Sequence, residues 1–377
     1  MELIELGTIL HMEKGKKPIA QSKEPTEGYL PYVDIKAFEQ GIIDNYATTD
    51  KSLLCEDGDL LIVCDGSRSG LTGRAVKGVV GSTLSKIYAD GLTTEYLRYF
   101  IQGKYILLNS KKKGTGTPHL NINVLKASKL IVPPISEQQR IVSRIEELFS
   151  SLDNAVETLQ KTKEQLAVYR QAVLKEAFEK CSEQVAVETI TEHVTDGDHM
   201  PPPKAKNGIP FIMISNIQGN NICWENTAFV GKDYFEKIDY KRKPQKGDVL
   251  YTVTGSYGIP VLVDYNKDFC FQRHIALLRP NERITQKFLY YSLMSPVVFS
   301  QATKGATGTA QKTVGLGVLR KIKIPYIAEL TEQMKIVRNI ESKLSMCDSI
   351  EQTVNTALTQ AEAMRQSILK KAFEGKL

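Results

Sequence analysis

The stretch 136–180 constrains the possible folds of this chain more than any other segment. It holds neither glycine nor proline, and its apolar residues recur at alternating steps of four and three. This spacing is typical of a coiled-coil seam and continues for about five heptads. A helix of about 45 residues extends for about 67 Å, so we expect it to span between other parts of the protein. Pro133 and Pro134 oppose an earlier start, and Ser136, with Gln139 three residues on, is the expected N-terminal cap.

The same pattern returns in residues 331–375, which align without a gap when the first stretch is shifted by 195 positions (331 minus 136). Both stretches close with the pattern RQxxLKxAFE. Two unrelated amphipathic helices rarely agree over this length, so we interpret the match as an internal repeat. We expect the two helices to pack antiparallel as a coiled coil. The expected seams comprise Ile141, Ile145, Leu148, Leu152, Ala155, Leu159, Thr162, Leu166, Tyr169 and Val173, and Ile336, Ile340, Cys347, Ile350, Val354, Ala357, Ala361, Met364 and Ile368, with Lys343 as an interruption that Leu344 can replace.

Length and composition fit two domains in a reducing compartment. The chain has 377 residues, and its six cysteines show neither a CxxC spacing nor a neighbouring histidine cluster. They are therefore interpreted as buried or free thiols. No apolar run approaches the roughly 18 residues that a membrane span needs, and the N-terminus lacks the pattern of a signal peptide, so we expect a cytoplasmic protein. The formal net charge of +6 permits a polyanionic partner without requiring one.

Residues 1–135 and 181–330 predict two mixed α/β globules with the same layout. In the first globule, short apolar runs separated by Gly, Pro and Asp predict strands. Glycine-aspartate pairs at 58–59 and 247–248 mark turns where glycine can supply a positive φ. The expected elements are strands at Leu30–Ile35, Leu60–Cys64, Val76–Val80 and Lys129–Val132, and a helix at Thr94–Tyr105 capped by Thr93 or Thr94. The expected correspondences are Leu30–Val33 with Ile209–Ile212, Gly58–Leu61 with Gly247–Leu250, and Thr94–Leu97 with Thr285–Phe288.

The predicted fold class is therefore α+β, with two globules separated and followed by long helices that form an antiparallel coiled coil with pseudo-twofold symmetry. The expected domains are the globule 1–135, the helix 136–180, the globule 181–330 and the helix 331–377.

The globules differ mainly in polar loops at equivalent places. Loop 64–74 corresponds to 253–259, and loop 110–121 corresponds to 303–313. Such loops suit a nucleic-acid surface, because Gly lets the backbone approach, Lys neutralises phosphates, and amides, Arg and His match base edges. Each residue alone is typical of a solvated loop, so the prediction rests on the recurrence. The predicted DNA-binding residues are Ser67, Arg68, Ser69, Lys111, Lys112, Lys113, Thr115, His119, Asn121, Asp198, His199, Ser256, Tyr257, Gln272, Arg273, His274, Lys304, Thr307, Thr309, Gln311 and Lys312.

Within this set, residue chemistry suggests different roles. Arg68 and Arg273 are the candidates for guanine, because a guanidinium can bond O6 and N7 together. Gln272 and Gln311 are the candidates for adenine. The three lysines at 111–113 are expected to contact phosphate without reading sequence. His119, Asn121 and His274 are weaker candidates for base contacts.

The chain lacks the sequence motifs of several enzyme classes. There is no GxxxxGK[ST] loop, no N/D-P-P-Y/F signature of base-amino methyltransferases, and no GxSxG, HExxH or Cys/His metal spacing. Asp34-Ile35-Lys36 resembles the D-x-K end of a nuclease site, but the second globule has Met213-Ile214-Ser215 there. We therefore predict no catalytic residue and no metal site. A stand-alone nuclease and a coiled-coil adaptor that binds no DNA remain the alternatives.

At this point the chain resembles the specificity subunit of type I restriction–modification enzymes. The resemblance rests on Leu130–Pro133 followed by Glu137-Gln138, on Ile322–Pro325 followed by Glu332-Gln333, and on the ending ILKKAFEGKL. The segment TDGDHMPPP, followed by GIPFIMISNI, in the second half also fits. One departure is that the first globule has no DGDH-type loop, its nearest equivalent being EKGKKP at 13–18. The two halves are therefore expected to read different sequences.

The resemblance implies two target-recognition domains that each read half of a split, asymmetric DNA site. It implies a non-catalytic subunit whose helices dock two methyltransferase subunits and, in a full system, restriction subunits. Adenosylmethionine, ATP and magnesium would then belong to those partners, and this chain would hold no cofactor.

Overall fold

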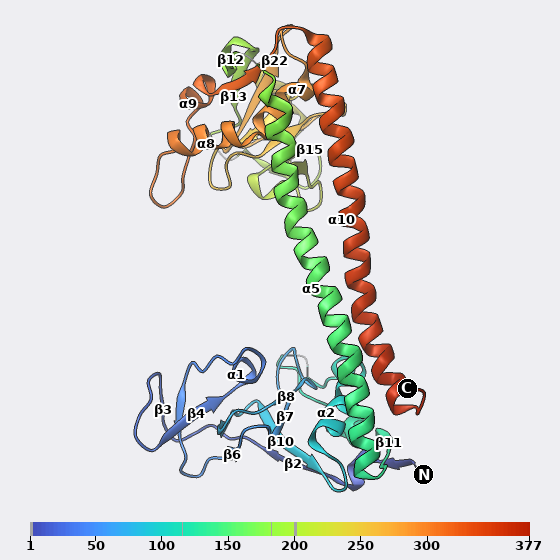
Figure 1. Cartoon of the computed structure of the whole chain (residues 1–377). Helices are drawn as coiled ribbons and strands as arrows, with labels where there is room; N and C mark the ends of the chain where they lie inside the picture. Colours follow the sequence, from blue (N-terminus) through green and yellow to red (C-terminus); the bar gives the residue numbers. More distant parts are fainter. Residues whose placement is uncertain (1–2, 115, 182, 200–201) are drawn as a thin grey trace. The chain divides into compact units, whose positions relative to one another are not determined.

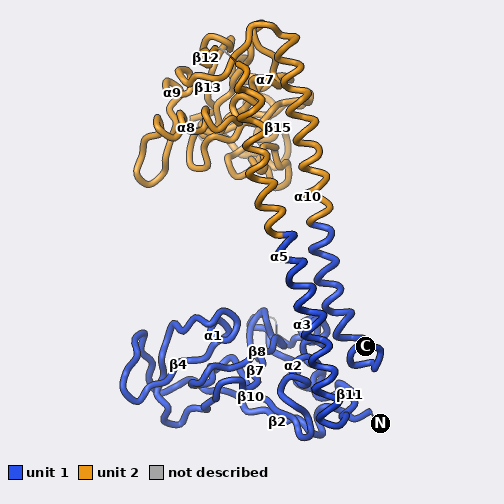
Figure 2. Tube along the Cα trace, in the orientation of Figure 1, with its two compact units in different colours: residues 1–159, 355–377 blue, residues 160–354 orange. Residues whose placement is uncertain are grey.

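The computed structural model describes residues 3–114, 116–181, 183–199 and 202–377, and it divides into two compact units (Figures 1 and 2). Unit 1 comprises residues 1–159 and 355–377, and unit 2 comprises residues 160–354. Each unit joins one globule to parts of both long helices, α5 (Ile135–Glu179) and α10 (Leu330–Phe373). In the described part of the chain, no helix is long and apolar enough to cross a membrane.

The globule of unit 1 is built from three sheets with the orders β1-β11, β2-β10-β7-β8 and β3-β5-β4-β9-β6. Among the described strands of this globule, only β4 and β9 pair in parallel. The strands are β1 (Leu3–Glu5), β2 (Leu10–Lys14), β3 (Gln21–Ser22), β4 (Tyr29–Val33), β5 (Tyr46–Thr48), β6 (Leu54–Cys55), β7 (Leu60–Val63), β8 (Thr72–Arg74), β9 (Gly78–Val80), β10 (Leu84–Ala89) and β11 (Lys129–Ile131). The short helices are α1 (Ile35–Gln40), α2 (Thr94–Gly103), α3 (Tyr105–Ser110) and α4 (Ile122–Lys126), besides the single turn η1 (Leu6–Thr8).

The globule of unit 2 repeats this arrangement with the sheet orders β12-β23, β13-β22-β19-β20 and β14-β18-β15-β21, and it adds the pair β16-β17. The strands are β12 (Glu183–Ala186), β13 (Thr191–Asp196), β14 (Lys204–Ala205), β15 (Ile209–Ile212), β16 (Ile217–Gln218), β17 (Asn221–Ile222), β18 (Ala228–Val230), β19 (Val249–Thr252), β20 (Pro260–Leu262), β21 (Cys270–Phe271), β22 (Ile275–Pro280) and β23 (Lys323–Tyr326). The helices are α6 (Lys232–Lys237), α7 (Gln286–Leu293), α8 (Pro296–Gly305) and α9 (Leu316–Lys321), with the single turns η2 (Val187–Thr189), η3 (Ile214–Asn216) and η4 (Tyr240–Arg242).

The repeat predicted from the sequence is therefore confirmed in the order of the sheets, while β6 of unit 1 and the pair β16-β17 of unit 2 have no counterpart among the described strands. The one parallel pair of unit 1 has its counterpart in β15 and β21, where Phe211 faces Cys270 as Tyr32 faces Val79. The predicted glycine turns are also confirmed, since Gly58 and Gly247 have φ of 87° and 99°. The expected correspondence of Thr94 with Thr285 is wrong by one residue, because Thr93 and Thr285 are the N-caps of α2 and α7.

The two long helices pack antiparallel within each unit (Figure 1). In unit 1, Ile145 and Phe149 of α5 share a core with Leu369 and Ala372 of α10. In unit 2, Leu174 and Phe178 of α5 share a core with Val337 and Ile340 of α10. Both cores also include the sheet and short helices of the globule, so each globule is fastened to both long helices.

The predicted seams are half right. The positions that include Ile145, Leu152 and Leu166, with their repeat partners, are buried or half-buried as expected. At the other seam positions, the buried residue is the one that follows the predicted residue. Val142 and Phe149, for example, are buried more deeply than Ile141 and Leu148. The same displacement occurs in α10, where Val337 is buried and Ile350 and Met364 are 44% and 53% exposed. Tyr169 is also largely exposed. The end of each helix packs on a globule as well as on the other helix, and this turns the buried face by one position.

Contacts in the structure explain why the repeats share the arginine of RQ and the phenylalanine of AFE. Arg170 and Arg365 occupy the displaced seam positions, and each reaches a carboxylate on the facing helix. Arg170 pairs with Asp348 at 2.7 Å in unit 2, and Arg365 pairs with Asp153 in unit 1. The aromatic rings of AFE end each helix against the globule: Phe178 meets Phe288 at 5.4 Å in unit 2, and Phe373 meets Tyr96 at 5.1 Å in unit 1.

A buried glutamine ties the start of each long helix to its globule. The Gln138 side chain is 0% exposed, accepts from Thr93 N at 2.8 Å, and donates to Gly91 O and Pro133 O. Gln333 makes the same three bonds, with Thr285 N, Arg283 O and Ile327 O. Helix α5 begins at Ile135, so Ser136 lies inside the first turn and is not the cap that the sequence suggested.

Candidate nucleic-acid interface

In unit 1, three polar loops converge at one end of the sheet β2-β10-β7-β8. The loop after β7 bonds to the loop 113–120 through Gly66 N to Pro118 O at 2.7 Å and Leu120 N to Cys64 O at 2.7 Å. Cys64 N also bonds to Thr83 O, in the turn before β10, at 2.8 Å. Lys113 and His119 exchange backbone hydrogen bonds of 2.9 and 2.7 Å, which close the outer loop.

Unit 2 reproduces this backbone bond for bond. Gly255 N bonds to Lys312 O at 2.9 Å, Val314 N to Val253 O at 2.8 Å, and Val253 N to His274 O at 2.9 Å. Thr307 and Thr313 exchange the bonds that Lys113 and His119 exchange in unit 1, at 2.9 and 2.7 Å. The loops that the sequence paired across the repeat are thus equivalent in the structure. Different side chains are mounted on one backbone framework.

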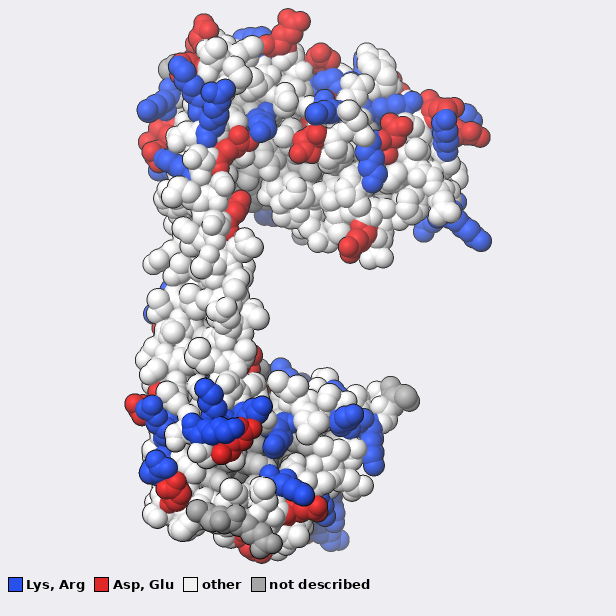
Figure 3. Space-filling view, turned by 90° about the vertical axis from the view of Figure 1, so that its right-hand side faces the viewer, with Lys and Arg blue, Asp and Glu red and all other residues white. Residues whose placement is uncertain are grey.

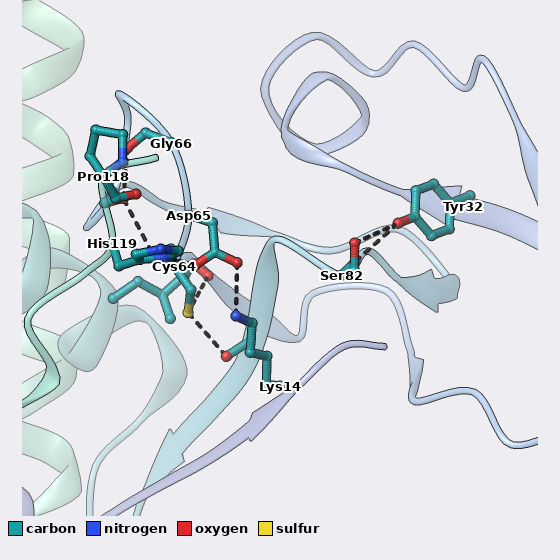
Figure 4. A network of polar contacts seen from close by, with 11 residues as sticks. Lys14, Tyr32, Cys64, Asp65, Gly66, Ser82, Pro118 and His119 are labelled. Atoms are coloured by element: carbon teal, nitrogen blue, oxygen red, sulfur yellow. Dashed lines mark hydrogen bonds and ion pairs between the residues drawn. The ribbon is translucent and has the colours of Figure 1, made fainter. Parts of the chain in front are cut away.

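An ion-pair network occupies the centre of the loops in unit 1 (Figure 4). Asp65 accepts from Lys14 Nζ at 2.8 Å and from the Nδ1 atom of His119 at 2.7 Å. Burial alone would raise the pKa of Asp65, but the hydrogen bonds from Lys14 and His119 outweigh it and hold the pKa below its ordinary value. Ser69 is buried, and its hydroxyl donates to Gly66 O at 2.7 Å, so it supports the loop from inside.

The remaining predicted residues of unit 1 lie around this centre. Ser67 and Arg68 are exposed, and Arg68 pairs with Glu39 at the edge of a shallow pocket of about 390 Å³. Lys112 Nζ donates to Ser67 O at 3.0 Å, which joins the lysine run to the loop after β7. Lys111 and Lys113 are exposed. Asn121 is half-buried at the N-cap of α4. Thr115 lies outside the described residues.

The DGDH loop of unit 2 forms a network of its own. Asp196 accepts from His199 Nε2 at 2.8 Å and from Arg242 Nη2 at 3.2 Å. Asp198 accepts from the Tyr234 hydroxyl at 2.7 Å. Burial, and then the bond to Asp198, raise the pKa of the Tyr234 phenol. Asp196 is therefore paired with a cation, and both carboxylates are oriented by hydrogen bonds.

The turn Gln272-Arg273-His274 lies directly beside this loop, since Asp198 N bonds to Phe271 O at 3.0 Å and Arg273 N to Asp198 O at 3.1 Å. Arg273 is exposed, and Gln272 and His274 are half-buried. All three line a pocket of about 460 Å³ together with Asp198 and His199. Phe211 is among the apolar residues that line it.

Strand register confirms that EKGKKP is the counterpart of the DGDH loop. Lys14 lies opposite Ser85 in β10, and Asp196 lies opposite Ala276 in β22, at the same place in both sheets. Gly15 and Gly197 follow, and a Cβ on either would lie within 2.3 or 1.9 Å of a backbone carbonyl oxygen. Only glycine fits this close approach. The side chains on the shared turn are cationic in unit 1 and mainly acidic in unit 2.

The other predicted residues of unit 2 lie on the outer loops. Gln311 lies over Gly255, while Ser256, Thr307, Thr309 and Lys312 are exposed. Tyr257 stacks on Phe299 of α8 at 5.8 Å and donates to Thr303 Oγ1, so one face of its ring is occupied. Lys304 is exposed in the last turn of α8.

Sequence reasoning missed four residues that shape these sites. Lys14, Asp65, Tyr234 and Arg242 orient the predicted residues, but their partners are distant along the chain. Lys14 lies in the segment EKGKKP, and Asp65 lies in the loop 64–74, so the sequence had singled out both segments without naming these two residues. No comparable signal marked Tyr234 or Arg242.

Two observations concern the alternative of a stand-alone nuclease. In residues 3–114, 116–181, 183–199 and 202–377, no group of His, Cys, Asp or Glu is placed to hold a metal ion. Asp34, the candidate of the nuclease alternative, caps α1 by accepting from Ala37 N at 2.9 Å. On the face shown in Figure 3, Lys and Arg are interspersed with Asp and Glu over each unit. This face therefore shows no patch of one charge, and the candidate interface is defined by its polar loops.

Fold and site together define a duplicated protein with two differently equipped reading surfaces and long connecting helices. The sequence pattern of the family described as "Type I restriction modification DNA specificity domain" matches residues 1–167 and 198–360. The chain belongs to this family of DNA specificity subunits.

Relatives and solved structures agree with this assignment. The MjaVIII type I restriction enzyme specificity subunit of Methanocaldococcus jannaschii is 27% identical over 100% of this chain and 92% of its own length. The EcoBI specificity subunit of Escherichia coli is 26% identical over 85% of this chain and 73% of its own length. A chain of the structure "Structural basis underlying complex assembly and conformational transition of the type I R-M system" has a TM-score of 0.77 at 20% identity, covering 100% of this chain and 98% of that one. The HsdS subunit from Thermoanaerobacter tengcongensis has a TM-score of 0.56 at 19% identity, covering 100% and 97%.

Proposed function

We propose that this chain reads a split, asymmetric DNA sequence, with the globule of each unit reading one block. The observation that carries the proposal is that one loop framework appears twice with different side chains. Lys14, Asp65 and His119 occupy it in unit 1, and Asp196, Thr254 and Thr313 occupy the equivalent places in unit 2. Equal frameworks favour equal modes of docking, while different donors and acceptors favour different bases.

We further propose that the chain is a non-catalytic scaffold for two methyltransferase subunits and for restriction subunits. The proposal rests on the family to which the chain belongs and on relatives that are named specificity subunits. Adenosylmethionine, ATP and magnesium would then be held by the partners. The methyl group would go onto an adenine in each block, flipped into the pocket of a methyltransferase. Assays of the purified chain for cleavage and methylation separate this proposal from a stand-alone enzyme.

The test of two-reader architecture is a chimera in which one reader is replaced by that of a relative. Exchange of residues 1–135 alone leaves the host's Val142, Ile145, Leu369 and Ala372 in the core of unit 1. A second chimera should therefore exchange residues 1–159 together with 355–377, which is the whole of unit 1. Each chimera is expressed with its methyltransferase subunit, and the methylated motif is read from genomic DNA.

We expect one block of the motif to change and the other to stay. The matched control exchanges residues 160–354, which should change the other block. If both blocks change together, or if neither changes in a chimera that still methylates, the two-reader proposal is wrong.

The lysine run 111–113 tests phosphate contact separately. Replacing the three lysines with alanine should weaken binding to cognate and random duplexes alike and reduce the log–log salt slope by roughly one unit per lost contact. A loss confined to the cognate duplex would contradict a phosphate role.

A further inference from the structure

We propose that Asp65 is a positioning residue that holds the His119 ring with Nδ1 protonated, so that Nε2 accepts a hydrogen bond from an exocyclic amino group of one base. The base would be an adenine or a cytosine in the block read by unit 1. This inference rests on the proposed function and adds the chemical group that one side chain reads.

The geometry fixes both the place and the orientation of the His119 ring. Its backbone is held by the two bonds to Lys113, and its Nδ1 lies 2.7 Å from Asp65 Oδ1. Asp65 is itself held by Lys14, whose ammonium lies 2.8 Å from the other carboxylate oxygen, Oδ2. The Asp65 side chain is 17% exposed, whereas the His119 side chain is 55% exposed. Asp65 is therefore the more buried member of the pair, and the imidazole of His119 is the more exposed one. Figure 4 shows both side chains together with Lys14.

The chemistry of the pair decides which nitrogen carries the proton. An ionised carboxylate can only accept hydrogen bonds, and Lys14 and His119 keep the pKa of Asp65 low against the effect of burial. Nδ1 must therefore donate, and in a neutral ring Nε2 is then an acceptor. Among the described residues, none bonds to Nε2. In the major groove, the amino groups available to an acceptor are N6 of adenine and N4 of cytosine.

The described residues of unit 2 have no Asp–His pair at the equivalent place. The bridge between Asp65 and His119 corresponds to the bridge between Thr254 and Thr313, whose hydroxyls lie 3.3 Å apart. A hydroxyl both donates and accepts, so it selects no single base in the same way. Unit 2 is therefore an internal control in every experiment on Asp65.

The central variant is Asp65→Asn, which keeps the shape of the side chain. Lys14 only donates, so the amide oxygen turns toward Lys14 and the amide NH2 faces His119 Nδ1. This arrangement favours the opposite tautomer, in which Nε2 donates. The double variant Lys14→Met, Asp65→Asn frees the amide oxygen to accept from Nδ1 again, so it should restore the original reading.

The assay measures binding of the full chain with its methyltransferase subunits at pH 8 to duplexes of the motif found by methylome sequencing. Purine replaces each adenine in turn and removes N6, and pyrimidin-2-one replaces each cytosine and removes N4. We expect one position in the block of unit 1 where the analogue weakens wild-type binding about tenfold. His119→Ala should bind natural and analogue duplexes equally at that position.

In Asp65→Asn the ratio of natural to analogue affinity at that position should fall to about one, and in the double variant it should return toward the wild-type value. In all these variants, the effect of base analogues in the block read by unit 2 should stay unchanged. If Asp65→Asn weakens both duplexes equally and keeps the ratio, or if His119 couples to a 7-deazaguanine substitution instead of an amino group, the inference is wrong. These results would overturn the role of Asp65 but would not affect the proposal of a split DNA site. The chimera experiments test that proposal separately.

Discussion

The buried glutamines at the starts of α5 and α10 provide the sharpest test of how the globules are fastened to the helices. Gln138→Met removes all three hydrogen bonds of the side chain while keeping most of its volume. Thr93 N, Gly91 O and Pro133 O then lose their partner. Leaving a buried polar group without a partner costs about 1–3 kcal/mol, so three groups at the low end of this range cost about 3 kcal/mol.

That loss corresponds to a fall in the melting temperature of about 6–12 °C for a unit of this size. The assay is thermal unfolding of the full chain combined with amide hydrogen exchange. The Thr93 amide should exchange about a hundredfold faster in Gln138→Met, while the Thr285 amide should keep its protection. Gln333→Met should reverse this pattern, because Gln333 holds Thr285 in unit 2.

The matched control is Gln139→Met, which changes the neighbouring, exposed glutamine. Its stability and its exchange pattern should equal those of the wild type. If Gln138→Met is no less stable than Gln139→Met, or if Thr93 keeps its protection, the glutamine does not fasten the helix to the globule as argued.

Three further predictions concern the helices and the buried charges. Val354→Asp buries an unpaired charge and should lower the free energy of unfolding by about 3–5 kcal/mol. Ile350→Asp, at a position 44% exposed, should lower it by less than about 0.5 kcal/mol. Equal losses in chemical denaturation would contradict the displaced seam. Asp248→Asn breaks a pair with Arg279 that is 2% and 10% exposed and should cost about 3–5 kcal/mol, while the repeat-equivalent Asp59→Asn, whose pair with Lys86 is more exposed, should cost about 1 kcal/mol or less. Burial of Glu95 would raise its pKa, but the hydrogen bonds from Arg74 and Arg98 outweigh burial and lower the pKa. Glu95 therefore stabilises the fold above the ordinary glutamate pKa of about 4.3, and this stabilisation is lost as the pH falls through the lowered pKa of the folded state. The stability difference between wild type and Glu95→Gln should therefore shrink below pH ~4.3, with the exposed Glu27→Gln as control, and a difference that grows on acidification would refute the argument.

The sequence predicted the long helices and the repeat because both are encoded locally and at a fixed spacing. It could not choose between Ile141 and Val142 for the seam, since both are apolar and adjacent. The choice depends on the globule packed against the helix, which is a tertiary effect. The helix start was misplaced for the same reason: Gln138, held by the globule, matters more than the expected cap Ser136.

At the site, the sequence predicted which loops converge but not how their side chains pair. Asp65 meets Lys14 from β2 and His119 from the outer loop, partners that are 51 and 54 positions away. Ser69 was predicted to bind DNA, yet it is buried and its hydroxyl donates to Gly66 O inside the loop. Pairings of this kind depend on the folded sheet and leave no periodic trace in the sequence.

The composition of unit 1 has a consequence for synthesis on the ribosome. Ile368, Leu369, Ala372 and Phe373 pack into or against its core, so the first globule to be translated cannot complete its core until α10 has emerged. At about 5–20 residues per second, the wait after residue 135 is on the order of 10–50 s. Unit 2 uses α10 only as far as Val354 and can close earlier. A premature stop after codon 354 would therefore damage the domain encoded first and spare the one encoded second.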